Sequence, residues 1–219
     1  MIRLRAGQVE RIVAVGAHCD DIAIGAGGSL YAACRAHPGV RVTALVLTGG
    51  GTERETEERA ALTALCPGAE IDLTVLKLPD GRTPAHWDEA KSAVRELRER
   101  ADTGLNADVV FAPNPGDAHQ DHRLLAELVP QVFRDHLVLG YEIVKSDGDL
   151  GRPAVYHPLA DDVARRKVDV LHEHYASQRH RPWFDDEAFL GLARIRGIEC
   201  QTRYAEAFHT TTVTLDLEG

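Results

Sequence analysis

The chain has 219 residues, of which 44% are hydrophobic and 27% are charged, as is usual for a globular protein with a sizeable core. The formal net charge is −9 and no block of lysine and arginine stands out, so we expect no nucleic-acid partner. We also expect no membrane span and no signal peptide, because no apolar run reaches about 18 residues and the N-terminal residues lack an apolar core.

In chain order, apolar β-branched runs alternate with segments of helical spacing. Strands are expected at 11–17, 41–48, 71–78, 107–112, 138–144 and, from β-branched alternation, 210–217. Helices are expected at 24–36, 53–65, 87–100, 124–136, 163–177 and 186–197. Pro130 is expected to kink the fourth of these.

This alternation predicts the α/β class and a Rossmann-like architecture, with a mostly parallel sheet and helices on both faces. No internal repeat or linker divides the chain, so we expect a single domain over residues 1–219. The four cysteines form no C-x-x-C pair, which favours reduced thiols and a cytoplasmic location over a disulfide framework.

Two polar clusters follow strands of this predicted sheet. His18, Asp20 and Asp21 follow the first strand, and the segment His119-Gln120-Asp121-His122 lies beyond the fourth. The carboxyl ends of parallel strands share one edge of a sheet, so the clusters are expected to meet where the strand order reverses. His18, Asp21 and one histidine of the second cluster would give three metal ligands and leave a position for water. Asp20 would then be placed to act as general base.

Each cluster taken alone is also compatible with a purely structural role. Two aspartates before a helix can serve as an N-cap and as partners of the helix dipole, and a single histidine at a strand end can be structural. The occurrence of both clusters after buried strands favours the metal site. Gly25, Gly27 and Gly28 do not form a dinucleotide-binding motif, because Leu30 stands where G-x-G-x-x-G requires glycine.

The two clusters resemble the motifs of the PIG-L/LmbE-like zinc-dependent N-deacetylases. The first family motif is typically A-H-P-D-D-E, and this chain has Ala17-His18-Cys19-Asp20-Asp21-Ile22. The second, H-x-D-H, is matched by residues 119–122. The segments 175–178 and 204–208 are similar to the family's C-terminal motifs, so that the resemblance covers nearly the whole chain.

The resemblance implies a role for each of the polar residues. Three would hold Zn²⁺, with Fe²⁺ as an alternative in the cell: His18, Asp21 and His122. Asp20 would be the general base, and a protonated His119, oriented by Asp121, would stabilise the tetrahedral intermediate. Arg54 and Asp80 stand where family members place residues that contact the substrate.

The implied reaction is removal of an N-acetyl group from an N-acetylglucosamine-type sugar or a small sugar conjugate. By residue type, Trp87, Trp183 and Tyr141 are candidates for stacking on a sugar ring. Two alternatives stay open. A metal-dependent phosphohydrolase would use similar side chains. A metal-impaired sugar-binding protein is suggested by Cys19 and Ile22, which replace the family's proline and glutamate. The sequence also leaves a homo-oligomer open.

Overall fold

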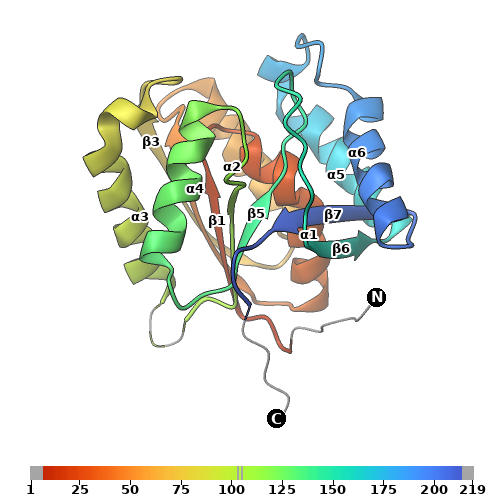
Figure 1. Cartoon of the computed structure of the whole chain (residues 1–219), viewed down its shortest axis with the longest axis horizontal. Coiled ribbons are helices and arrows are strands. Elements are labelled where there is room, and N and C mark those ends of the chain that lie inside the picture. Colours follow the sequence, from red (N-terminus) through yellow and green to blue (C-terminus); the bar gives the residue numbers. More distant parts are fainter. Residues whose placement is uncertain (1–6, 103, 105, 214–219) are drawn as a thin grey trace.

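The computed structural model describes residues 7–102, 104 and 106–213 (Figure 1). A seven-stranded sheet has the strand order β3-β2-β1-β4-β5-β7-β6. Its strands are β1 (Arg11–Gly16), β2 (Arg41–Thr48), β3 (Glu70–Leu78), β4 (Val109–Pro113), β5 (Val138–Tyr141), β6 (Val155–Leu159) and β7 (Tyr204–His209). The first five are parallel, whereas β7 pairs antiparallel with β5 and β6. The predicted α/β class with a mostly parallel sheet is confirmed.

Helices cover both faces of the sheet (Figure 1). On one face lie α1 (Asp21–Ala36), α2 (Glu53–Leu65), α5 (Asp161–His174) and α6 (Asp186–Glu199). On the other lie α3 (Trp87–Ala101) and α4 (Gln120–Val132). Two short 3₁₀ helices complete the set, η1 (Thr83–His86) and η2 (Ala176–Gln178). β1 and β2 are apolar runs because layers on both sides bury them.

Close packing between α1 and β5 fixes the start of α1. A Cβ added at Gly25 would lie 2.2 Å from Cδ2 of Tyr141, so no other residue fits there without a rearrangement. The Tyr141 hydroxyl donates a hydrogen bond of 2.7 Å to the carbonyl oxygen of Val15 on β1. Tyr141 therefore ties α1, β1 and β5 together. It is fully buried and does not stack on a sugar, contrary to the suggestion made from its residue type.

The sheet ends differently from the sequence prediction. The last strand is β7, and residues 210–213 of the expected final strand contain none, while 214–217 lie outside the described residues. β6 was not predicted because Pro158 interrupts its apolar pattern; as an edge strand it tolerates proline. β5 ends at Tyr141 and not at Val144.

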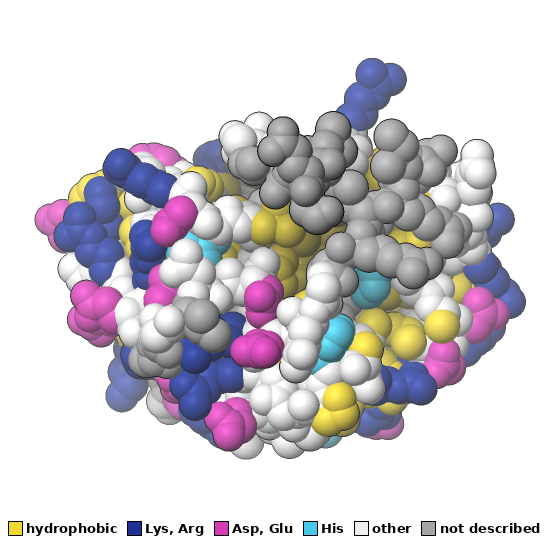
Figure 2. Space-filling view, turned by 90° about the horizontal axis from the view of Figure 1, so that it is seen from below, with side chains coloured by type: hydrophobic (Ala, Val, Ile, Leu, Met, Phe, Trp, Pro, Cys, Tyr) yellow, Lys and Arg dark blue, Asp and Glu magenta, His cyan; other side chains and the backbone are white. Residues whose placement is uncertain are grey.

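The surface charges, the helices and the cysteines bear on the expectations from composition. On the face seen from below in Figure 2, acidic and basic side chains are interspersed. In the described part of the chain, no helix combines the length and the apolar character that crossing a membrane requires. The four cysteines are free and buried.

Candidate active site

Both polar clusters lie at the carboxyl edge of the sheet, at the upper end of β1 and β4 in Figure 1. β1 and β4 are neighbours, and the chain continues from β1 to β2 on the opposite side. The clusters therefore meet where the strand order reverses, which is where open α/β sheets bind ligands. α4 begins at Gln120, four residues earlier than expected, so His122 belongs to its first turn.

Three potential ligand atoms from the two clusters face one another. His18 Nδ1 lies 3.1 Å from His122 Nε2 and 3.3 Å from Asp21 Oδ2. His122 Nε2 lies 3.1 Å from the same oxygen of Asp21. A tetrahedral zinc ion with bonds of about 2.0–2.2 Å separates its ligand atoms by roughly 3.3–3.6 Å. Two imidazole nitrogens and a carboxylate oxygen at these separations fit such an ion.

The backbone before α1 holds the Asp21 carboxylate in this triangle. Its Oδ2 accepts hydrogen bonds from the backbone N–H groups of Ala17 at 3.0 Å and His18 at 2.8 Å. Burial alone would raise the pKa of Asp21, but the positive charges of His122, Lys145 and His18 outweigh burial and hold the pKa well below its usual value. Asp21 is therefore ionised, as a metal ligand must be.

Asp117 orients His122, and sequence reasoning assigned it no role. Its Oδ2 lies 2.7 Å from His122 Nδ1, and its Oδ1 accepts a hydrogen bond of 2.8 Å from the backbone N–H of His119. A carboxylate on the far nitrogen fixes the tautomer and the ring orientation of a metal-binding histidine. The spacing of five residues within an irregular loop carries no recognisable signal.

Replacing Asp117 by alanine is expected to lower zinc affinity by about 10–100-fold, because His122 loses the partner that orients it. Competition with a chromophoric chelator measures that affinity without any assay of activity. Asp149→Ala is the matched control: its carboxylate accepts a hydrogen bond of 2.6 Å from the N–H of Ala118 in the same region but contacts no metal-site histidine. Equal affinities for the two variants would show that Asp117 does not support the site.

Asp20 occupies a strained backbone position between β1 and α1. Its φ is 128°, in the region that favours glycine, and such strain persists at functional sites because the surrounding structure enforces it. The carboxylate is buried, with Oδ2 at 3.0 Å from Arg54 Nη2 and Oδ1 at 3.2 Å from Lys145 Nζ. Burial raises the pKa of Asp20 above its usual value, although Lys145 and Arg54 oppose the shift.

His119 and Asp121 are placed differently from the roles that the resemblance implied. The Asp121 carboxylate contacts His18 Nε2 at 3.2 Å and accepts hydrogen bonds from the N–H groups of Gly81 and Thr83, so the side chain of Asp121 orients His18. The backbone N–H of Asp121 donates to His119 Nδ1 at 3.2 Å, which leaves the imidazole proton on Nε2. Burial lowers the pKa of His119, and the nearby imidazoles of His18 and His122 lower it further, which favours a neutral ring where the resemblance implied a protonated one.

A cavity of about 380 Å³ opens over these groups, and Arg54 and Asp80 both line it. Asp80 Oδ1 lies 3.1 Å from His18 Nε2, and its side chain is 78% exposed. The Arg54 guanidinium already bonds to Asp20, to the carbonyl oxygen of Cys19 and, at 2.9 Å, to Ser177 Oγ. Arg54 therefore holds the wall of the cavity, while Asp80 is the freer of the two to meet a ligand.

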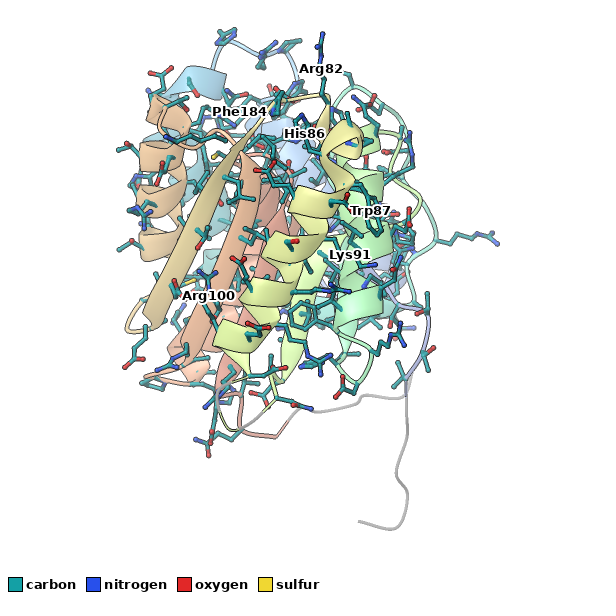
Figure 3. All side chains as sticks on the ribbon, turned by 90° about the vertical axis from the view of Figure 1, so that its left-hand side faces the viewer. Arg82, His86, Trp87, Lys91, Arg100 and Phe184 are labelled. Atoms are coloured by element: carbon teal, nitrogen blue, oxygen red, sulfur yellow. The ribbon has the colours of Figure 1, made fainter. Side chains whose placement is uncertain are left out.

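The remaining aromatic candidates do not line the cavity. Trp87 lies on α3 beneath the ammonium of Lys91, 4.3 Å from the ring centroid (Figure 3). The Trp183 ring lies 5.1 Å from Nζ of Lys145, which does line the cavity.

The two departures from the family motifs leave the ligand triangle intact. Cys19 is a buried residue at the wall of the cavity, and its Sγ lies 3.5 Å from the carbonyl oxygen of Thr48. Burial raises the pKa of this thiol above its usual value, so it stays protonated at neutral pH. Ile22 is fully buried in the core between α1 and the sheet.

The family model for GlcNAc-PI de-N-acetylases, PIG-L, matches residues 13–133, which is more than half of the chain and includes both polar clusters. The chain therefore belongs to the PIG-L family of de-N-acetylases.

Individual relatives extend the similarity beyond residues 13–133. The chain is 27% identical to the "uncharacterized deacetylase YaiS" of Escherichia coli K12, over 77% of this chain and 92% of that protein. The conserved protein TT1542 of Thermus thermophilus superposes with a TM-score of 0.72 at 22% identity, covering 96% and 98% of the two chains. N,N'-diacetylchitobiose deacetylase of Pyrococcus horikoshii superposes with a TM-score of 0.69 at 19% identity, covering 91% of this chain and 83% of that one. At these low identities, the superpositions show that TT1542 and the chitobiose deacetylase have the same fold as this chain.

Proposed function

We propose that this protein is a zinc-dependent hydrolase that removes the N-acetyl group from an N-acetylglucosamine-type sugar or a small sugar conjugate. The observation that carries the proposal is the triangle of His18 Nδ1, His122 Nε2 and Asp21 Oδ2, with sides of 3.1–3.3 Å, at the base of an open cavity. The family membership and the chitobiose deacetylase of similar fold support an acetylated amino sugar as the substrate.

The proposed mechanism assigns one task to each group around the triangle. When bound, zinc supplies Lewis-acid activation of water and of the acetyl carbonyl. Asp20, next to the ligands but outside their set, accepts the proton of the attacking water and returns it to the departing amine. His119 donates its Nε2–H, as a neutral imidazole, to the acetyl oxygen as negative charge develops there. Asp117 and Asp121 hold the rings of His122 and His18 in place.

The cavity supports a small substrate. Its volume of about 380 Å³ is in the range of pockets for small molecules. Asp80, Lys145 and Gln178 along its wall offer acceptors and donors for sugar hydroxyl groups. We infer that the substrate is a monosaccharide or a small conjugate.

The test is acetate release from a panel of N-acetylglucosamine derivatives by protein whose zinc and iron contents are measured first. Zinc near one per chain with acetate from any member of the panel supports the proposal. Phosphate release from sugar phosphates in place of acetate would favour the phosphohydrolase. Binding of sugars without acetate release, even when zinc is supplied, would favour the metal-impaired sugar-binding protein. If the protein takes up no metal at all, the proposed metal site is wrong.

A further inference from the structure

Lys145 joins the two adjacent carboxylates at the base of the cavity, although no sequence motif points to it. Its Nζ lies 3.2 Å from Asp20 Oδ1 and 3.1 Å from Asp21 Oδ1. The side chain is 19% exposed and lines the cavity. Among the residues that the structure describes, no other side chain forms ion pairs with both aspartates.

We propose that Lys145 is a positioning residue for the hydrolysis proposed above: its ammonium holds the Asp20 carboxylate at a fixed place beside Asp21. This inference rests on the proposed function. The new element is that the proposed base, Asp20, depends for its position on Lys145, a cation from the segment after β5.

The arrangement of the carboxylate oxygens supports this role. Asp21 directs Oδ2 to the two histidines and Oδ1 to Lys145, while Asp20 directs Oδ2 to Arg54 and Oδ1 to Lys145. Both carboxylates are buried, so water does little to reduce their mutual repulsion. A shared ammonium offsets the repulsion and sets the separation of the two groups. Without it the Asp20 carboxylate would turn away from Asp21, whose own carboxylate is held by two backbone N–H groups.

Arg54 cannot take over this task. Its guanidinium is held by Ser177 Oγ at 2.9 Å and by Glu57 Oε2 at 3.5 Å, besides its bonds to Asp20 and to the Cys19 carbonyl. It reaches Asp20 from the α2 side and forms no ion pair with Asp21 among the described contacts. Lys145 donates two of its three N–H groups to the aspartates, and the third has no acceptor in the described protein, which leaves it available to the substrate.

Neighbouring residues anchor the segment that carries Lys145 and flank its ammonium. Three residues earlier, Glu142 forms a buried bidentate pair with Arg196 of α6, with N···O distances of 2.6 and 2.8 Å. The ring of Trp183 lies on another side, 5.1 Å from Nζ. The Glu142–Arg196 pair thus anchors the chain three residues before Lys145, and an anchored support favours precise placement of a reacting group.

The experiment compares Lys145→Met with wild type in steady-state kinetics on a substrate that wild type hydrolyses. Loss of the ammonium is expected to lower kcat by about 100-fold, as misplacement of a reacting group by about 1 Å does, with KM changed less and zinc content unchanged. In Lys145→Ala, added ethylammonium is expected to restore kcat at least about ten-fold, because a free cation can occupy the vacated place. Ethanol or propanol, which fill the space without charge, should not.

Lys91→Met is the matched control, since Lys91 also lies over a tryptophan ring but far from the cavity (Figure 3). It should keep the wild-type kcat. The proposal is overturned if Lys145→Met keeps kcat within about three-fold of wild type or if the alcohol rescues Lys145→Ala as well as the cation does.

A second readout separates this inference from the proposed function. If wild type releases no acetate from any substrate, the proposed function fails, and the contact itself is tested by thermal unfolding of Lys145→Met, Asp20→Asn and the double variant. If the double variant loses less Tm than the two single variants lose together, the result supports the proposed contact between Lys145 and Asp20. Additive losses overturn it.

Discussion

Replacing Asp20 by asparagine is expected to lower kcat for acetate release by about 10²–10⁴-fold, the usual contribution of a positioned acid–base group. Asparagine has nearly the same size and also tolerates the positive φ that this position requires. It cannot take a proton from water, however. Zinc content should stay near the wild-type value, because the Asp20 oxygens face Arg54 and Lys145 and not the ligand triangle.

Asp147→Asn provides the control for this experiment. Asp147 also lines the cavity, so its replacement removes a carboxylate from the same wall without touching the proposed base. We expect kcat within a few-fold of wild type for this variant. An Asp20→Asn protein that keeps full activity would show that another group accepts the proton. One that loses its zinc would show that Asp20 belongs to the metal site.

The second large effect concerns stability, and it arises from Glu58 on α2. This carboxyl is fully buried; Oε2 accepts a hydrogen bond of 2.6 Å from the Tyr175 hydroxyl, and Oε1 has no partner in the described protein. Burial raises the pKa of Glu58 from 4.5 to about 8, and the negative charges of Asp20 and Asp21 contribute to the shift. The folded protein therefore keeps Glu58 protonated at neutral pH.

The sign of the pH dependence follows from this raised pKa. Below about pH 4.5 the group is protonated in both folded and unfolded chains, so its titration does not change the free energy of unfolding. As the pH rises toward 8, the unfolded chain releases the proton while the folded chain retains it, so the free energy of unfolding falls. Glutamine stays neutral throughout, so Glu58→Gln removes this loss. Its stability advantage over wild type should grow by about 3–4 kcal/mol between about pH 5 and about pH 8.5.

Urea unfolding of wild type and Glu58→Gln at these two pH values, with equal metal content, measures the difference. Other titrating groups cancel because both proteins contain them. A fixed offset between the two proteins is compatible with the expectation, since the amide changes the bond to Tyr175 at every pH. A difference that does not change with pH would show that Glu58 is already ionised in the folded protein.

The parallel part of the fold was predictable because burial on two faces leaves a direct mark in the sequence. β1 and β2 are continuous apolar runs, and the expected ranges match closely. β7 lacks that mark: Glu206 lies in it, and its carboxylate accepts hydrogen bonds from Gly28 and Ser29 of α1 and pairs with Lys167. From the sequence, a charged residue such as Glu206 is expected at the surface, because the partners that allow its burial lie on distant elements.

The same reason limits the prediction of the site. His18, Asp21 and one histidine of the 119–122 segment could be selected because each follows a strand end in a short motif. The choice of His122 came from the family resemblance, and the structure brings His122 close to His18 and Asp21. Asp117, Lys145 and Glu58 act through contacts that the fold creates between separate elements. No spacing in the sequence predicts these contacts. Even the orientation of His18 by Asp121 depends on a contact across 103 positions.

The distance along the chain between the proposed ligands also bears on biosynthesis. His18 and His122 are 104 positions apart, although their ring nitrogens lie 3.1 Å from each other. On the ribosome, two of the three proposed ligands thus emerge long before the third, and the nascent chain has no complete site until α4 has been made and β4 has joined β1. Since a metal site rarely exists before its fold does, we expect the proposed zinc ion to be acquired after the fold has formed.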